Sequence, residues 1–186
     1  MLASDNSVEK TPLEGALLLS PKKFVDGRGA FHKLYTSALL SSWGIRFDIA
    51  EDYLTYSCKG ALRGLHCQTE PYSQAKLVTC LRGRIFDVIV DLRQSSKTCG
   101  KWFSVVLTGK THQTLYIPRG FAHGCLSLEE DTLVTYKADN PYMEKHEAGL
   151  LWSDPALGIP WPDKKGIIVS EKDAELPPLS AAVRFR

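Results

Sequence analysis

Short runs of alternating apolar and polar residues, separated by Gly, Pro, Asn and Asp, constrain the fold of this sequence more than any other feature. The clearest run is Arg84–Leu92, whose even-numbered positions 86 to 90 are apolar, whereas the other strand face carries Asp87 and Asp91. Two acids on one face of an otherwise apolar strand indicate a polar cavity. Many short strands with few helices predict an all-β protein, an antiparallel sandwich or barrel of the jelly-roll type.

One helix and five further strands follow from the same patterns. Thr36–Trp43 predicts a short helix that ends at Gly44. Lys76–Leu81 predicts a strand joined to the next one through a tight turn at Arg82–Gly83. The remaining predicted strands are Trp102–Thr108, Gln113–Ile117, Gly124–Leu128 and Thr132–Ala138. From about Lys145 the chain is Pro-rich and irregular, and we expect it to pack over the barrel.

The bulk composition fits a single globular domain. The chain has 186 residues, of which 44% are hydrophobic and 24% charged, so it is long enough to bury a core. Residues 1–11 lack the basic start and apolar stretch of a signal peptide, and we expect them to form a disordered lead to one domain over residues 12–186. A formal net charge of +2 and the lack of a long apolar run give no indication of nucleic-acid or membrane binding.

The cysteines indicate a cytoplasmic protein with reduced thiols. They are five in number and irregularly spaced, and no CxxC pair occurs among Cys58, Cys67, Cys80, Cys99 and Cys125. Neither a zinc ribbon nor a thioredoxin-type redox site is therefore indicated.

Two of the five histidines lie in segments that indicate chemistry. His66 follows Arg63 closely, and imidazole is the side chain that ordinarily titrates near neutral pH. His123 follows a turn predicted at Pro118–Gly120, which would direct it toward the interior face of the next strand. We expect the other three to be structural: His32, His112 and His146.

The spacing Pro-x-Gly-x-x-His from Pro118 to His123 is similar to that of the cupin barrels, in which this histidine often binds a metal. Metal cupins add His-x-His on an earlier strand and a nearby Glu, where this chain offers only His66 and Gln68. Two histidines with no further good ligand make a poor metal site. We therefore expect a cupin-like barrel that works without a metal or another cofactor.

Nine short segments of the chain together match one known family. They are Asp26–Gly29, Leu62–Gln68, Gln74–Val78, Phe86–Arg93, Ile117–Gly124, Tyr136–Lys137, Trp152–Pro155, Ile159–Pro162 and Ser170–Asp173. In this order they resemble the dTDP-4-dehydrorhamnose 3,5-epimerase family, from about Leu13 to Pro178. The resemblance implies a cupin-like antiparallel jelly-roll barrel with a few short peripheral helices. It also implies an isomerase that epimerises a nucleotide-linked 4-keto-6-deoxyhexose at C3, C5 or both, in deoxysugar biosynthesis such as that of lipopolysaccharide.

The residue types suit this chemistry. The C–H bonds beside the ketone are acidic, so inversion needs a base on one face, an acid on the other and a group that stabilises the enolate oxygen. The resemblance implies that His66 is the base and that Asp173 orients it. It also implies that Tyr136 returns a proton from the opposite face and that Lys76 stabilises the enolate.

The resemblance further implies a set of substrate-binding residues and a homodimer whose N-terminal strands add to the partner's sheet. Arg63 and His123 would line the sugar and diphosphate region, and Arg28 and Tyr142 the nucleotide side. The other predicted substrate-binding residues are Gln74, Glu51 and Tyr53.

The chain departs from the family near the expected nucleotide site. Glu51-Asp52-Tyr53 stands where the family usually has Gln-Asp-Asn, and Lys33 stands near the place of a Glu. These exchanges alter charge and size, so the identity of the base and of the sugar stays open.

Two structural questions and three alternative functions also stay open. Strict strand alternation places Arg63 and His66 on opposite faces, so both reach one site only if Arg63 precedes the regular strand or a bulge intervenes. Asp87 is a candidate to polarise His66 or Lys76. The alternatives are an epimerase for C3 or C5 only, a metal-dependent cupin enzyme and a non-catalytic sugar-binding barrel.

Overall fold

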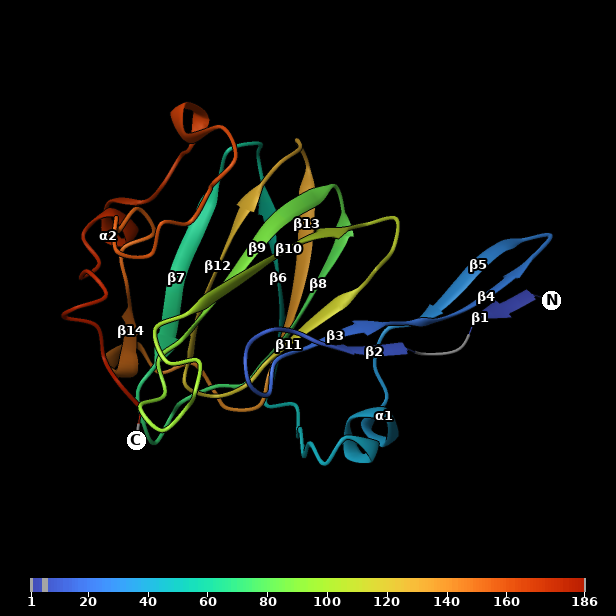
Figure 1. The fold of residues 1–186 in the computed structure, drawn as a ribbon. Helices are drawn as coiled ribbons and strands as arrows, with labels where there is room; N and C mark the ends of the chain where they lie inside the picture. Colours follow the sequence, from blue (N-terminus) through green and yellow to red (C-terminus); the bar gives the residue numbers. More distant parts are fainter. Residues whose placement is uncertain (1, 5–6, 186) are drawn as a thin grey trace.

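The protein is described by a computed structural model that covers residues 2–4 and 7–185 (Figure 1). Its strands are β1 Leu2–Ser4, β2 Ser7–Lys10, β3 Leu17–Ser20, β4 Lys22–Asp26, β5 Gly29–Lys33, β6 Glu51–Ser57, β7 Leu62–Gln68, β8 Lys76–Arg82, β9 Arg84–Asp91, β10 Trp102–Thr108, β11 Thr114–Ile117, β12 Phe121–Ser127, β13 Thr132–Ala138 and β14 Glu147–Gly149. Its helices are α1 Ser37–Ser42 and α2 Glu171–Ala174, with short 3-10 turns at Glu144–His146 and Lys164–Gly166. None of the helices in this described part is long and apolar enough to cross a bilayer.

Two antiparallel sheets form the body of the molecule. One has the strand order β10-β9-β12-β7-β14, and the other has the order β2-β3-β11-β8-β13-β6. Neighbouring strands are far apart in the sequence, as in β7 beside β12 and β8 beside β11. This arrangement is the cupin-like jelly roll that the sequence predicted, with few and short helices.

Strand alternation creates the core, as expected from the Arg84–Leu92 pattern. Ile85 and Ile89 of β9 pack between the two sheets, against Val78 of β8 and Val134 of β13. Val88 of the same strand points to the outer face of its sheet. Burial of side chains of this size stabilises the fold by roughly 1.5–3 kcal/mol each.

The C-terminal segment covers the outer face of the five-stranded sheet, as predicted from its irregular composition. Leu150, Leu157, Trp161 and Phe185 are buried there against β7, β9 and β12. This segment places α2 in contact with β7, the strand that carries the predicted base His66.

The predicted helix and turn are both present. Thr36 caps α1 by accepting a hydrogen bond from the Leu39 backbone N–H at 3.2 Å, and Gly44 follows with a φ of 73°. Gly83 makes the tight turn between β8 and β9 with a φ of 78°. A side chain at Gly83 would approach Thr132 within 2.5 Å, so the turn requires glycine.

The N-terminal segment differs from the predicted disordered lead over residues 1–11. Ser7–Lys10 pairs with β3, and Leu2–Ser4 pairs with β4. The edge of β3 supplies hydrogen-bond partners, and Val8 packs against the apolar cluster outside the six-stranded sheet. Residues 1, 5 and 6 of this prediction lie outside the described residues. Figure 1 shows β1, β4 and β5 extending away from the barrel as an arm.

Candidate active site

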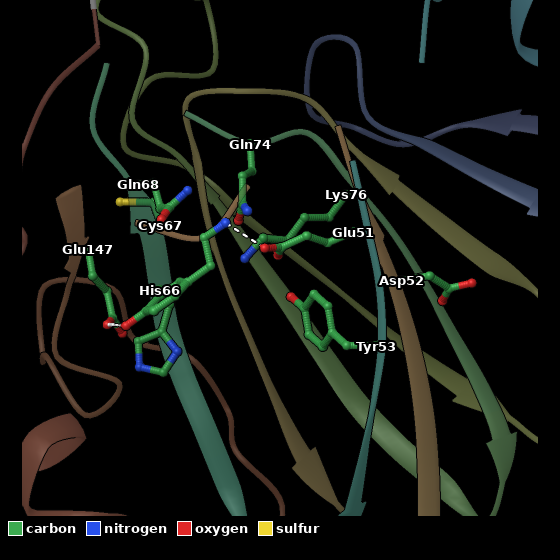
Figure 2. Close-up of a pocket in the computed structure, with 10 residues that line it drawn as sticks. Glu51, Asp52, Tyr53, His66, Cys67, Gln68, Gln74, Lys76 and Glu147 are labelled. Carbon is green, nitrogen blue, oxygen red and sulfur yellow. Dashed lines mark hydrogen bonds between the residues drawn. The ribbon is translucent and has the colours of Figure 1, made fainter. Parts of the chain in front are cut away.

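A cavity of about 590 Å³ opens at one end of the barrel, with β7 and β14 on one side and β6 and β8 on the other (Figure 2). It is lined by Glu51, Asp52, Tyr53, His66, Cys67, Gln68, Gln74, Lys76, Tyr142 and Glu147. Six of these were predicted site residues: His66, Lys76, Glu51, Tyr53, Gln74 and Tyr142.

His66 is held by a carboxylate that lies 107 residues further along the chain. Its Nε2 is 2.8 Å from Oδ1 of Asp173, whose second oxygen accepts a hydrogen bond from the Gly64 backbone N–H at 2.9 Å. Burial would raise the pKa of Asp173, but the hydrogen bonds from His66 and Gly64 outweigh it and hold that pKa below its ordinary value. An ionised Asp173 accepts a hydrogen bond from the Nε2–H group of His66 and so leaves Nδ1 free to act as a base.

A bulge in β7 explains how Arg63 and His66 can lie on the same side of the strand. His66 pairs with His123 and Arg63 pairs with Cys125, so β7 takes three steps where β12 takes two. The extra residue lets Arg63 and His66 project from the same side of the strand. Arg63 does not line the cavity; its Nε donates to Ser57 Oγ of β6 at 3.2 Å.

The bulge depends on glycine. Gly64 has a φ of 125°, and a Cβ there would lie 2.6 Å from the Cα of Gly124 and 2.7 Å from the carbonyl oxygen of His123. The close backbone approach therefore excludes any larger residue.

Lys76 enters the cavity from the first position of β8, across from His66 (Figure 2). Desolvation by burial lowers the pKa of Lys76, and the nearby Cys67, Glu147 and Glu51 act in the opposite direction. A poorly solvated ammonium group interacts strongly with a negative charge that develops beside it.

Tyr136 and His123 lie behind the cavity, in the barrel interior. Tyr136 is 5% exposed, its ring meets that of His123 edge-on at 6.0 Å, and its hydroxyl contacts the Cys125 sulfur at 3.4 Å. Burial raises the pKa of Tyr136 well above its ordinary value, so the phenol keeps its proton.

Asp87 corrects one prediction. It was expected to polarise His66 or Lys76, but both of its oxygens lie within 3.1 Å of His123 Nε2. The reason is topological, because β9 pairs with β12, which carries His123, whereas β7 and β8 are not paired with β9. Asp87 and His123 form a buried pair in the barrel floor.

The opposite rim is fixed by hydrogen bonds to the loop before β14. The Tyr142 backbone N–H donates to Glu51 Oε1 at 2.8 Å, and its hydroxyl donates to Glu147 Oε2 at 2.6 Å. Gln74 Nε2 donates to the Asn140 carbonyl oxygen at 2.7 Å. These contacts hold the predicted substrate-binding residues of this rim in place.

Sequence reasoning missed four lining residues: Asp52, Cys67, Gln68 and Glu147. Gln68 could have been found, because it stands two positions after His66 on the same strand and so shares its face. Glu147 gave no signal, because its strand has only three residues and no readable alternation.

Arg28 is the predicted site residue that lies elsewhere. It sits in the turn between β4 and β5, is paired with Asp26 at 2.7 Å, and its side chain is 88% exposed. It borders a separate hollow on the arm with Phe24 and Phe31. Within one chain, Arg28 is not part of the cavity.

The side chains of the described residues form no metal site. Within residues 2–4 and 7–185, no three His, Cys, Asp or Glu side chains are grouped as a metal site would require. The Nε2 atoms of His66 and His123 each face a carboxylate.

A jelly-roll barrel in which a histidine–carboxylate pair faces a lysine and a tyrosine across one cavity has the architecture of a proton-transferring isomerase. Comparisons with known proteins identify the family to which this isomerase belongs. The family described as dTDP-4-dehydrorhamnose 3,5-epimerase matches residues 10–181. The chain belongs to this family.

Individual relatives agree. The chain is 42% identical over 163 residues to a dTDP-4-dehydrorhamnose 3,5-epimerase of Sinorhizobium fredii, covering 87% of this chain and 84% of the relative. Its fold is similar to that of the Legionella pneumophila dTDP-6-deoxy-D-glucose-3,5-epimerase in complex with dTDP-4-keto-L-rhamnose. The TM-score is 0.92 and the sequence identity 33%, over 98% of this chain and 100% of that chain. A 3'-monoepimerase of Streptomyces bikiniensis in complex with dTDP-quinovose matches with a TM-score of 0.86 and 33% identity over 91% of this chain and 86% of that one.

Proposed function

We propose that this chain epimerises a dTDP-linked 4-keto-6-deoxyhexose at C3 and C5, as a cytoplasmic enzyme of deoxysugar biosynthesis that needs no cofactor. The observation that carries the proposal is the Asp173-held His66 on one cavity wall, with Lys76 and Tyr53 on the facing wall and Tyr136 stacked against Tyr53. Residues 12–186 would act as one epimerase domain.

His66 is the base in this proposal. Its Nδ1 takes a proton from the carbon beside the ketone, and Asp173 stabilises the imidazolium that results. The electron pair of the broken C–H bond moves toward the ketone oxygen. Lys76 stabilises that oxygen, and its position inside a partly dry cavity strengthens the interaction.

Tyr136 returns a proton from the face opposite His66. It belongs to the six-stranded sheet, whereas His66 belongs to the five-stranded sheet, so the two approach the sugar ring from different sides. Its raised pKa keeps the proton available until the enolate forms.

The remaining groups would place the substrate. Gln74, Glu51, Tyr53 and Tyr142 surround the mouth of the cavity, where the nucleotide side is expected. Arg63 and His123 would lie toward the sugar and the diphosphate, and the Arg63 guanidinium suits a phosphate oxygen.

We also propose a homodimer in which the arm of one chain reaches its partner. Arg28 lies outside the cavity of its own chain, so a role at the nucleotide requires the partner's cavity. The arm exposes Phe31 at 60%, and the edge strand β6 exposes Leu54 at 61% and Tyr56 at 55%, which a partner chain would cover.

The test is incubation with several nucleotide-linked 4-keto-6-deoxy sugars in D2O, with deuterium at C3 and C5 read by NMR. We expect uptake at both carbons with a dTDP-linked sugar. Uptake at one carbon only would favour a monoepimerase, and no uptake with any such sugar would overturn the proposal.

A metal-dependent enzyme is the alternative that chelation tests. Because His66 and His123 pair with two different aspartates and no three such ligands are grouped among the described residues, we expect turnover to survive EDTA. Loss of turnover that zinc, iron or manganese restores would contradict the cofactor-free mechanism.

A further inference from the structure

Two tyrosines from neighbouring strands lie face to face on the wall opposite His66. Tyr53 of β6 and Tyr136 of β13 are register partners, so their side chains project from the same face of the six-stranded sheet. Their rings are stacked, with centroids 5.1 Å apart and planes within 8°. Both phenols therefore approach the sugar from the side that His66 does not occupy.

The two phenols differ in their access to the cavity. Tyr136 is 5% exposed, and its hydroxyl contacts the Cys125 sulfur. Tyr53 is 39% exposed and lines the cavity itself. Figure 2 shows its hydroxyl directed into the cavity, toward Lys76 and Glu51.

The Tyr53 hydroxyl is available to a substrate. Among the described residues it makes no hydrogen bond within the chain, whereas the hydroxyl of Tyr142 at the same rim is bound to Glu147. Burial, followed by the charges of Glu51 and Cys125, raises the pKa of Tyr53 to about 12. The phenol therefore carries its proton at neutral pH.

We infer that Tyr53 is a second catalytic proton donor of this site, beside Tyr136; the inference rests on the proposed epimerisation. His66 removes a proton, and the C–H electron pair enters the enolate. The Tyr53 O–H then transfers its proton to that carbon from the opposite face, so that a new C–H bond forms. The phenoxide regains a proton from water, and the His66 imidazolium releases one to water.

Two donors suit a reaction that inverts two carbons, and because Tyr53 stands where the family usually has Asn, the second donor would be a feature of this chain rather than of the family. C3 and C5 lie on either side of the ketone carbon, and each needs a donor within hydrogen-bond reach. The stacked pair provides two hydroxyl groups on one wall at different depths. Each phenol would serve one carbon.

The test compares Tyr53→Phe with Tyr136→Phe, because both keep the stacked rings and delete only a hydroxyl. With the 4-keto sugar that the wild type converts in D2O, NMR reads configuration and deuterium at each carbon. For Tyr53→Phe we expect inversion at one carbon to fall by about 10²-fold or more. Exchange at that carbon should continue, because His66 can return a deuteron on the same face. Tyr136→Phe should affect the other carbon.

Tyr116→Phe is the matched control. Tyr116 lies on β11 of the same sheet as Tyr53, but its ring packs against Phe47 and does not line the cavity, so the variant should match the wild type. The inference is overturned if Tyr53→Phe inverts every carbon that the wild type inverts at an unchanged rate. That outcome leaves the proposed function standing, whereas a wild type that takes up no deuterium would refute both.

Discussion

At the scale of single residues, two histidines with the same kind of partner differ in their position in the barrel. His66 and His123 each face a buried carboxylate, yet His66 lies on the cavity wall and His123 lies in the barrel floor. In the proposed mechanism Asp173 orients the base, whereas Asp87 holds the buried His123 ring in place.

The Asp173→Asn variant tests this distinction. A neutral amide at this position would no longer accept a charge-assisted hydrogen bond, so kcat should fall, but by less than the roughly 10²–10⁴-fold that removal of a general base typically costs. Steady-state kinetics of this variant and of one that lacks the His66 imidazole would measure the difference. An Asp173→Asn enzyme with wild-type kcat would show that the carboxylate does not orient His66.

The lowered pKa of Asp173 predicts that the stability of the fold depends on pH. Because the folded-state pKa of Asp173 is lowered, its ionised form stabilises the fold at pH values above its ordinary pKa of about 4. This contribution disappears as the pH falls through the folded-state value. Denaturant unfolding should therefore separate wild type from Asp173→Asn at pH 7 more than at pH 3, and an equal difference at both pH values would contradict the lowered pKa.

Sequence patterns located His66 and His123 but not their partners. The two histidines stand in recognisable local motifs, whereas the contact of His66 with Asp173 spans 107 residues and was expected only from the family resemblance. Asp87 was correctly predicted to face the barrel interior, but its predicted partner was wrong. Local alternation does not indicate which strands pair when they are far apart in the sequence.

At the scale of elements, the bulge in β7 is the feature that brings Arg63 and His66 to the same side. Strict strand alternation would place these two residues on opposite faces, and a bulge was one of the two arrangements predicted to bring them together. The helix at Thr36–Trp43 and the β8–β9 turn were predicted correctly because capping and glycine signals are local. The three-residue strand β14 was too short to predict.

Replacement of Gly64 by Ala tests the role of the bulge. Because a Cβ would collide with the backbone of Gly124, we expect the free energy of unfolding to fall by about 1–3 kcal/mol, with a loss of activity. Gly27→Ala is the control, because a Cβ at Gly27 meets nothing within 4 Å. Urea unfolding would measure both, and a Gly64→Ala protein as stable and active as the control would refute the argument.

At the scale of the whole molecule, the barrel was predictable and the arm was not. Alternating strands imply two packed sheets. The segment that forms β1 and β2 has only a weak alternation, although β1 pairs with β4 and β2 pairs with β3. An arm that extends from the barrel and exposes Phe31 has no partner within the described part of its own chain that buries this side chain.

We expect light scattering at micromolar concentration to give twice the mass of one chain. Phe31→Ser should shift the mass toward the single chain, because it removes an apolar ring from the proposed interface. Ile168→Ser serves as the control, since Ile168 is equally exposed, at 59%, but forms a bridge with Ala61 beside β7 rather than with a strand of the arm. A wild type with the mass of one chain would contradict the dimer.

The assignment of His66 as the base is the central claim, and one measurement tests it most directly. Wild type and His66→Asn are incubated with the dTDP-linked 4-keto-6-deoxy sugar in D2O, and NMR follows deuterium at C3 and C5. Because His66 is the only imidazole among the described residues that line the cavity, the variant should lose exchange at both carbons by at least about 10²–10⁴-fold. Exchange at a rate near that of the wild type would contradict the claim and make Lys76 the next candidate for the base.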